Sequence, residues 1–353
     1  MSRDREQLGP VREAHRFDEA ALGRHLEAKL PEAGRLLGVQ QFEGGQSNPT
    51  FLLECDRARL VLRKKPPGKL LPTAHQIDRE YRVMGALENT AVPVPKMRLL
   101  CEDPEVIGTA FYLMDHISGR IFRDPTLPGV DREQRSAIYA EMVRVLAELH
   151  GVDWAAVGLG DFGKPSGYMA RQISRWSQQY QAAKTEDIAS MDRLMEWLPA
   201  HLPEGDATTI AHGDFRLDNM IFHPTEPKVL GLLDWELATL GHPLCDVAYS
   251  CMVYHVELLH RPSLKNLGPD SGVPSEAEYV ARYCRLTGRE RIDDWSFFLA
   301  FSLFRSASII QGVYKRGLQG NASSATALEL GSLVKGLCDT AWATANDPQN
   351  TTS

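Results

Sequence analysis

The chain has 353 residues, 43% of them hydrophobic and 24% charged, a composition typical of a folded globular protein that leaves little room for extensive disorder. This length suits two lobes that share a cleft better than one small core. With 39 Lys and Arg against 46 Asp and Glu, the formal charge is -7, so we expect no nucleic-acid partner and no cationic surface for acidic lipid.

The first part of the chain alternates short apolar runs with turns. A glycine-containing turn between two β-type runs is typical of a hairpin, and a helical pattern follows a Pro-Pro-Gly breaker. In chain order the runs are 41–42, 50–54 and 59–63, the helix is 74–87, and two further runs are 97–100 and 110–114. This order predicts a small antiparallel sheet with one helix packed across it.

From about residue 131 the pattern becomes helical, with amphipathic stretches at 131–150, 168–183 and 190–198. Helices dominate the rest of the chain except over 209–246, where acidic and amide residues lie beside apolar β-type runs. We therefore expect the chemistry of the protein in that interruption. The most apolar stretch, 295–313, contains charged and polar residues, so we interpret it as a buried helix and expect no membrane partner.

The six cysteines are scattered without a CxxC pair, and the first residues carry no apolar signal segment. Both features indicate reduced thiols in a cytoplasmic protein. Segment 158–165 (GLGDFGKP) matches GxGxxG and contains DFG, but it follows a predicted helix rather than a strand, so we expect a loop. The sequence contains no GxSxG elbow, which disfavours a serine hydrolase.

Three oxygen-bearing side chains in the interruption, Asp214, Asn219 and Asp234, fit the needs of phosphoryl transfer. That reaction depends mainly on positioning and on neutralising phosphate charge. It needs a carboxylate near the attacking hydroxyl and hard oxygen ligands for Mg²⁺, of which the protein usually supplies only one or two. An Asp five residues before an Asn lets one loop address both the hydroxyl and the metal.

These residues lie in segments that resemble a known family. Segment 212–219 (HGDFRLDN) resembles the HGDxxxxN loop of aminoglycoside phosphotransferases, choline kinases and homoserine-kinase-like enzymes, which is itself similar to the protein-kinase HRDxxxxN loop. Segment 233–236 (LDWE) is similar to the second metal motif of that family. Segment 241–248 (GHPLCDVA) resembles its GDPxxDLA segment, with His242 in place of the usual acid. The resemblance covers roughly residues 42–254.

The resemblance implies a role for each residue of the loop. Asp214 would orient or deprotonate the acceptor hydroxyl, while Asn219 and Asp234 would hold Mg²⁺. Arg216 occupies the position where protein kinases often have a Lys that touches the transferring phosphate. Asp246 would be a buried acid that braces the loop. The role of Glu236, as a metal neighbour, a substrate contact or a solvated acid, stays open.

The resemblance extends to the nucleotide side. The turn formed by Gly44, Gly45, Gln46, Ser47 and Asn48 would cover the phosphates with its backbone NH groups. Met114, Asp115 and Ile117 would belong to a hinge that offers backbone hydrogen bonds to the nucleobase.

The phosphate-binding cation departs from the family pattern. Arg63 would reach the α and β phosphates and pair with Glu80, although the family usually has a Lys there. Arg is longer and planar, so the exchange is not conservative. Lys65 has the same strand parity and is the alternative. Segments 63–68 and 79–83 also look like kinase-like domains fused to, or encoded beside, acyl-CoA dehydrogenases.

The sequence thus predicts an α+β, bilobal protein-kinase-like fold, with a small antiparallel-sheet N-lobe over 1–115 and a mainly helical C-lobe over 116–353. The resemblance implies a kinase that moves the γ-phosphoryl group of Mg-ATP, or of GTP, to a hydroxyl of a small metabolite or an aminoglycoside-like acceptor. A nucleotide-binding pseudokinase without transfer activity is the alternative, favoured only by Arg63. The sequence leaves open the identity of the acceptor, the nucleotide preference and whether the protein forms a homodimer.

Overall fold

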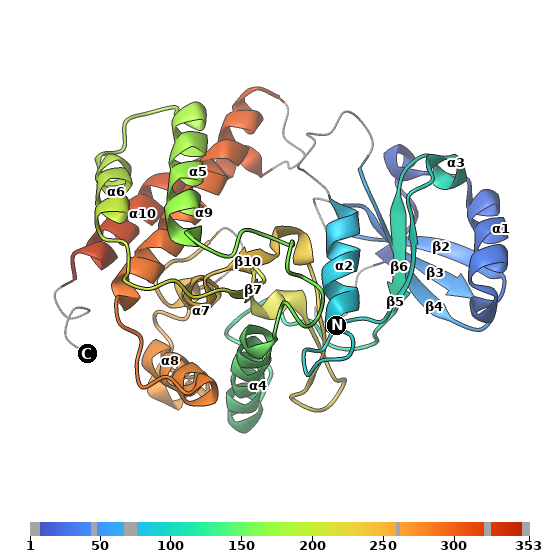
Figure 1. The fold of residues 1–353 in the computed structure, drawn as a ribbon, viewed down its shortest axis with the longest axis horizontal. Coiled ribbons are helices and arrows are strands. Elements are labelled where there is room, and N and C mark those ends of the chain that lie inside the picture. Colours follow the sequence, from blue (N-terminus) through green and yellow to red (C-terminus); the bar gives the residue numbers. More distant parts are fainter. Residues whose placement is uncertain (1–7, 44–47, 67–75, 259–261, 321–325, 348–353) are drawn as a thin grey trace. The chain divides into compact units, whose positions relative to one another are not determined.

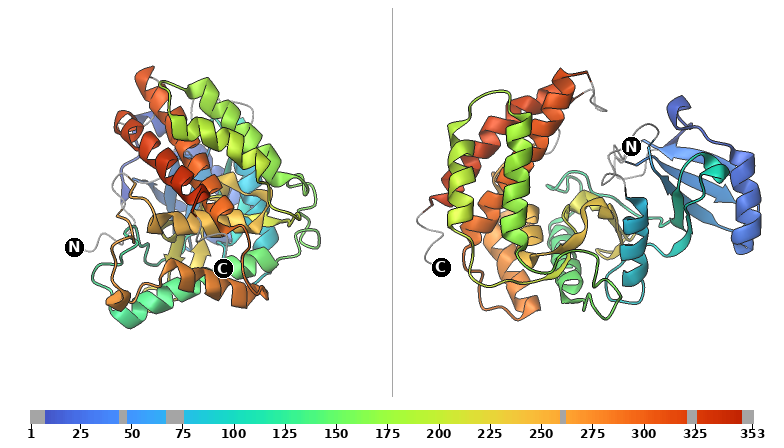
Figure 2. Two further views of the ribbon diagram at one scale, coloured as in Figure 1. Left: turned by 90° about the vertical axis from the view of Figure 1, so that its left-hand side faces the viewer. Right: turned by 45° about the horizontal axis from the view of Figure 1, so that its top comes forward.

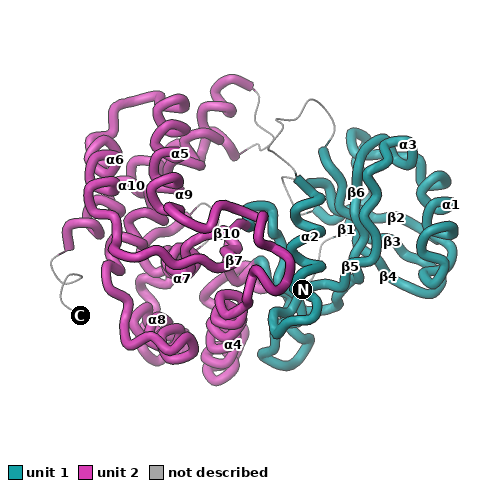
Figure 3. Tube along the Cα trace, in the orientation of Figure 1, with its two compact units in different colours: residues 1–121, 219–238 teal, residues 122–218, 239–353 magenta. Residues whose placement is uncertain are grey.

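The computed structural model describes residues 8–43, 48–66, 76–258, 262–320 and 326–347, and Figure 1 shows its helices and strands. Packing divides the chain into two compact units, drawn in Figure 3. The first consists of Met1–Ile121 and Asn219–Ala238, and the second of Phe122–Asp218 and Thr239–Ser353. The domains over 1–115 and 116–353 remain a prediction, whereas the first unit also takes in the later segment 219–238.

The first unit contains a six-stranded antiparallel sheet in the order β1-β2-β3-β4-β6-β5. The strands are β1 (Leu8–Gly9), β2 (Leu36–Phe42), β3 (Thr50–Cys55), β4 (Arg59–Lys64), β5 (Met97–Cys101) and β6 (Phe111–Asp115). Every β-type run predicted in this part of the chain is a strand. Alternating side chains on these strands point to opposite faces of the sheet.

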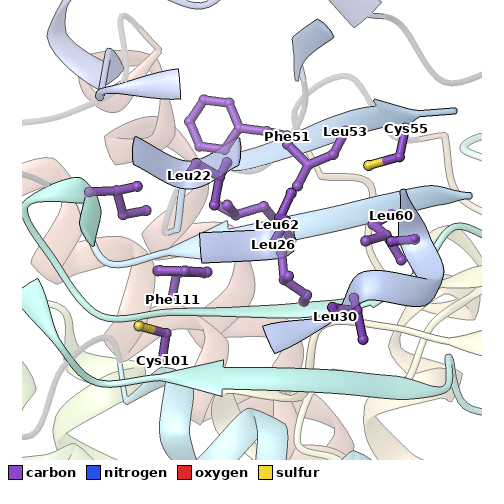
Figure 4. Packing of buried hydrophobic residues seen from close by; sticks show 13 residues of the cluster. Leu22, Leu26, Leu30, Phe51, Leu53, Cys55, Leu60, Leu62, Cys101 and Phe111 are labelled. Carbon is purple, nitrogen blue, oxygen red and sulfur yellow. The ribbon is translucent and has the colours of Figure 1, made fainter. Parts of the chain in front are cut away.

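One face of this sheet is covered by helix α1 (Glu19–Lys29). Figure 4 shows Leu22 and Leu26 of this helix packed against the apolar side chains of the strands, among them Leu62 and Phe111. These four side chains are fully buried, and each contributes roughly 1.5–3 kcal/mol through removal of apolar surface from water.

The opposite face of the sheet meets helix α2 (Ile77–Leu87), which corresponds to the helix predicted over 74–87. Residues 74 and 75 lie outside the described residues. Arg63 on β4 and Tyr112 on β6 are direct cross-strand partners, and both side chains reach Glu80 on α2. The helix therefore carries a buried acid onto the strand pair that bears the predicted cation.

A second antiparallel hairpin belongs to the first unit. It consists of β8 (Met220–Phe222) and β9 (Val229–Leu232) and is followed by the short 3-10 helix η4 (Trp235–Leu237). The short helices of the first unit are α3 (Pro104–Ile107), η1 (Glu13–His15) and η2 (Pro31–Ala33), and η3 (Leu217–Asn219) precedes β8.

The second unit is mainly helical, as the sequence predicts. Its helices are α4 (Arg132–Gly151), α5 (Tyr168–Ala183), α6 (Ala189–Ala200), α7 (Pro243–Cys251), α8 (Glu276–Thr287), α9 (Trp295–Leu318) and α10 (Ala327–Ala345), with 3-10 turns η5 (Met252–Tyr254) and η6 (Pro269–Ser271). A small sheet pairs β7 (Thr209–Ala211) with β10 (Thr239–Gly241). Segment 158–165 forms turns without a helix or strand, so the expected loop is confirmed.

Helix α9 lies at the centre of the second unit, where it packs against α10, α5 and α7, and both views in Figure 2 show α9 and α10 alongside each other. By length and composition, α9 is the one helix among the described residues that could cross a membrane. In the structure, 72% of its apolar window is buried. The predicted buried helix over 295–313 is therefore confirmed.

All six cysteines are free and buried: Cys55 and Cys101 in the first unit, and Cys245, Cys251, Cys284 and Cys338 in the second. Burial raises the pKa of Cys338 to about 12. A buried thiol of this kind is unreactive because nucleophilic attack requires the thiolate.

Candidate active site

The loop that carries Asp214 is fastened by helix α7 in the second unit. The Asp246 carboxylate, only 1% exposed, accepts hydrogen bonds from the backbone NH groups of His212 (2.6 Å) and Gly213 (2.8 Å). Gly213 has a φ of 81°, a conformation that glycine adopts without the strain a side chain brings. Asp246 therefore braces the loop, as predicted.

A histidine that the sequence analysis does not single out supports this brace. His150 Nε2 lies 3.4 Å from Asp246 Oδ2, and its Nδ1 lies 2.8 Å from the hydroxyl of Tyr283. Burial acts to raise the pKa of Asp246, but the hydrogen bond and charge of His150, with the charge of His212 and the amide of Gly213, hold that pKa below its ordinary value. Asp246 is therefore an ionised, fully bonded acid at neutral pH.

The carboxylate of Asp214 has partners on both oxygens. The Tyr249 hydroxyl on α7 donates to Oδ1 at 2.5 Å, and Arg216 Nε lies 3.1 Å from Oδ2. The side chain of Asp214 is 15% exposed, so the surrounding protein limits but does not abolish its contact with solvent. Tyr249 has no place in the family motif, and the sequence signals it only as a residue one helical turn after Asp246.

Arg216 lies between two acids of its own loop. Its Nε is 3.1 Å from Asp214 Oδ2 and 3.3 Å from Asp218 Oδ1. Burial raises the pKa of Asp218, although the charge of Arg216 opposes that shift. In this arrangement Arg216 is held by carboxylates, and its expected contact with the transferring phosphate remains a prediction.

In the first unit, the guanidinium of Arg63 lies among three acids. Its Nε is 3.0 Å from Glu80 Oε2, and its Nη2 is 2.9 Å from Asp234 Oδ1 and 3.9 Å from Glu236 Oε2. Burial alone would lower the pKa of Arg63, but the charges of Glu80, Asp234 and Glu236 raise it. In the described part of the chain Arg63, not the alternative Lys65, contacts Glu80.

Glu80 is the most enclosed member of this group, with 1% exposure. The Asn48 side-chain amide donates to its Oε1 at 2.8 Å, and the Tyr112 hydroxyl donates to its Oε2 at 3.0 Å. Burial acts to raise the pKa of Glu80, while Arg63 and these hydrogen bonds act to lower it. The buried Asn48 side chain thus supports the ion pair. The other predicted turn residues, Gly44, Gly45, Gln46 and Ser47, lie outside the described residues.

The β8–β9 hairpin brings the two predicted metal ligands to the same end of the first unit. Met220 pairs with Leu232, and the backbone NH of Leu233 donates to the carbonyl of Asn219 at 2.8 Å, immediately before Asp234. Asp234 has a φ of 66°, a strained conformation for a residue other than glycine and one that is frequent at functional sites.

The donor chemistry at this hairpin end fits Mg²⁺. Amide and carboxylate oxygens are hard ligands, and Mg²⁺ in nucleotide sites takes few of them from protein because phosphates and water complete its shell. The described residues contain no group of three or more His, Cys, Asp or Glu placed to hold a metal.

The predicted hinge residues lie at the end of β6 in the first unit. The backbone NH of Asp115 donates to Lys96, and its carboxylate accepts two hydrogen bonds from Arg98 at 2.6 and 2.8 Å. Met114 is buried at 7% exposure. The amide of Asp115 is thus already used by the fold, and a nucleobase contact at Met114 or Ile117 remains a prediction.

A profile described as the phosphotransferase enzyme family matches residues 38–295, well over half of the chain. The chain belongs to this phosphotransferase enzyme family. The predicted enzyme class, a phosphotransferase, is therefore confirmed at the level of the family.

Curated relatives of this phosphotransferase are longer proteins. It is 48% identical to acyl-CoA dehydrogenase family member 10 of Mus musculus over 94% of this chain and 32% of that protein. It is 46% identical to acyl-CoA dehydrogenase family member 11 of Homo sapiens over 94% of this chain and 44% of that protein. The chain thus spans less than half the length of these relatives, and the predicted resemblance to kinase-like domains associated with acyl-CoA dehydrogenases is confirmed.

Solved structures confirm the predicted fold class. A Ralstonia eutropha JMP134 protein provisionally named an aminoglycoside phosphotransferase is 49% identical, with a TM-score of 0.85 over 94% of this chain and 98% of that chain. A thermostable mutant of aminoglycoside phosphotransferase APH(4)-Ia, solved with AMP-PNP and hygromycin B, is 15% identical, with a TM-score of 0.62 over 92% of this chain and 99% of that chain. The second likeness concerns the fold alone.

Proposed function

We propose that this phosphotransferase moves the γ-phosphoryl group of a Mg-bound nucleotide, ATP or GTP, to a hydroxyl of a small-molecule acceptor. The observation that carries the proposal is the β8–β9 hairpin, which places Asn219 beside the Leu233–Asp234 segment. Asn219 follows Asp214 by five residues, so the chain itself limits their Cα separation to roughly 18 Å.

In this proposal Asp214 orients the acceptor hydroxyl and accepts its proton as the oxygen attacks the γ-phosphorus. The bridging P–O bond breaks and the nucleoside diphosphate leaves. Each carboxylate oxygen has two lone pairs, so the hydrogen bond from Tyr249 does not by itself use up the acceptor capacity of Oδ1. Arg216 is the cation in this loop that could turn toward the transferring group.

Asn219 and Asp234 would hold Mg²⁺, which when bound neutralises charge on the phosphate oxygens. Arg63 would contact the nucleotide phosphates while Glu80 keeps it in place. Its present hydrogen bond to Asp234 implies that nucleotide and metal compete with this ion pair when they bind. Metal binding and phosphate binding would then be coupled, because an Arg63 side chain that contacts the phosphates releases Asp234 to bind the metal.

The second unit contains an apolar cavity of about 100 Å³ next to the loop. The loop residues Arg216 and Asp218 line one side of it, and the remaining lining residues are mostly apolar, such as Met142 and Val256, with Arg123 as a second cation. Its one acid, Asp218, is paired with Arg216, so the cavity offers little to a polycation. We therefore favour a partly apolar acceptor, an acyl-CoA-related or hydroxy-acid metabolite, over an aminoglycoside.

A screen for acceptor-stimulated release of ADP or GDP tests the proposal. Hydroxylated carboxylic acids, hydroxyacyl-CoA esters and aminoglycosides are offered with Mg-ATP and Mg-GTP to the wild type and to Asp214→Asn. We expect product formation by the wild type and a loss of about 10²- to 10⁴-fold in the variant, with nucleotide binding retained. Nucleotide binding with equal background hydrolysis in both proteins would instead identify a pseudokinase.

We also propose a cytoplasmic location, supported by the six free thiols, which the structure shows buried and unpaired with one another. Fractionation of cells with an antibody against the chain tests it. Recovery of the protein outside the cytoplasmic fraction would contradict the proposal.

A further inference from the structure

Three residues of helix α7 form hydrogen bonds with four consecutive residues of the loop, 212–215. Asp246 accepts from the amides of His212 and Gly213, and Ser250 Oγ lies 2.8 Å from the carbonyl of Phe215. Tyr249 holds the remaining residue, Asp214, by its side chain rather than by its backbone. Positions 246, 249 and 250 share one face of the helix because they are three and four residues apart.

The hydroxyl of Tyr249 is a hydrogen-bond donor that keeps its proton. Burial raises the pKa of Tyr249, and the neighbouring charge of Asp214 raises it further. A short hydrogen bond from a neutral hydroxyl to an ionised carboxylate is among the stronger ones in proteins. The 2.5 Å contact therefore fixes Oδ1 of Asp214.

The ring of Tyr249 is itself held from outside the loop. The guanidinium of Arg305 on α9 lies 5.7 Å from the centre of this ring and 5.7 Å from that of Trp176 on α5. Arg305 is 8% exposed. Cation–π contacts of this kind resist displacement when they are desolvated, so three helices set the position of the hydroxyl.

Without Tyr249, the carboxylate of Asp214 has a competing arrangement. Arg216 already lies 3.1 Å from Oδ2, and a guanidinium prefers to bind both oxygens of a carboxylate at once. Rotation of Asp214 toward Arg216 would turn Oδ1 away from the position that it holds here. The Tyr249 hydrogen bond opposes that rotation because it holds Oδ1 of Asp214 against helix α7.

We propose that Tyr249 is a positioning residue for phosphoryl transfer, which holds Oδ1 of Asp214 against rotation toward Arg216 and so keeps the carboxylate in place for the acceptor hydroxyl. Tyr249 donates to Asp214 before and after transfer, and it is neither deprotonated nor consumed. This inference rests on the proposed function, since it concerns the carboxylate that takes the hydroxyl proton.

The test compares Tyr249→Phe with a matched control, Tyr254→Phe, in the intact chain. The Tyr254 hydroxyl also lies in the second unit, where it donates to the carbonyl of Pro274 at 2.9 Å, so both changes remove one part-buried, hydrogen-bonded hydroxyl. The probe is Mg-ATP with water as the acceptor, followed as ADP release, and the same assay is repeated with any acceptor found in the screen.

We expect kcat to fall about 10- to 100-fold in Tyr249→Phe, as for a misplaced reacting group, with KM for ATP and the melting temperature close to those of Tyr254→Phe. A crystal structure of Tyr249→Phe should show the carboxylate of Asp214 rotated toward Arg216. Equal kcat in the two variants, or an unmoved Asp214, would overturn the inference. Equal hydrolysis by wild type and Asp214→Asn would instead sink the proposed function, whatever Tyr249 does.

Discussion

The two units hold the acids of the predicted site by different means. In the first, one guanidinium, Arg63, lies among Glu80, Asp234 and Glu236, so the arrangement depends on the balance of charge between side chains. In the second, Asp246 binds backbone amides and Tyr249 binds Asp214, so it depends on donors fixed by a helix. A metal or phosphate can compete for the first kind of contact, whereas the second kind is built to stay in place.

The largest effect should come from breaking the backbone anchor. Asp246→Ala leaves the amides of His212 and Gly213 buried without their acceptor, together with His150. We expect a loss of about 3–5 kcal/mol in the free energy of unfolding, the range for a buried charge partner removed. Urea denaturation followed by fluorescence measures it. A loss below about 1 kcal/mol would show that the loop holds itself without α7.

A smaller loss of stability should follow from replacing Arg63, the cation among the three acids of the first unit. Arg63→Lys keeps a charge near Glu80 but cannot place two nitrogens on two acids, so we expect a loss of about 1–2 kcal/mol by the same measurement. Arg59→Lys is the matched control, because Arg59 lies on the same strand and pairs with Glu54 at 2.9 Å on the surface. That control should change stability by less than about 1 kcal/mol. Equal losses in both variants would contradict the comparison.

The smallest change in stability should come from the protonation of Asp246 as the pH is lowered from neutral. Its pKa in the folded protein is lowered, so its contribution to stability is complete above the unfolded pKa of about 3.9 and is lost as the pH falls from there toward the folded pKa. Urea unfolding between pH 6 and pH 3 should therefore show a steeper loss in the wild type than in Asp246→Asn. Parallel curves would mean that Asp246 is not ionised in the folded protein.

Much of the fold follows from local pattern. The strands and α2 are predictable because apolar residues alternate or recur at helical spacing against a single face of a core. Helix α1 escapes prediction because its buried residues, Leu22 and Leu26, form a stripe only one residue wide on an otherwise small or polar helix. The pairing of segment 219–238 with the first unit also cannot be read locally, since it depends on contacts made far along the chain.

Part of the candidate site is likewise predictable from the sequence, and part is not. Motif spacing indicates Asp214, Asn219, Asp234 and Asp246, because the loop, the hairpin and the helix that carry these residues follow one another at fixed intervals in the sequence. Tyr249 cannot be found by that reasoning: a tyrosine one turn after a buried acid looks like any core tyrosine until the loop is folded against it. Its function lies in a hydroxyl oriented by tertiary contacts, which a linear pattern does not encode.

The buried cysteines give the chain its own set of chemical reporters. Two lie in the first unit and four in the second, and none pairs with another. An alkylating reagent can reach each sulfur only when the surrounding structure opens, so mass spectrometry of labelled peptides can time the opening of each unit separately. If nucleotide slows the alkylation of Cys55 and Cys101 alone, its binding stabilises the first unit and not the second. The measurement needs no engineered label.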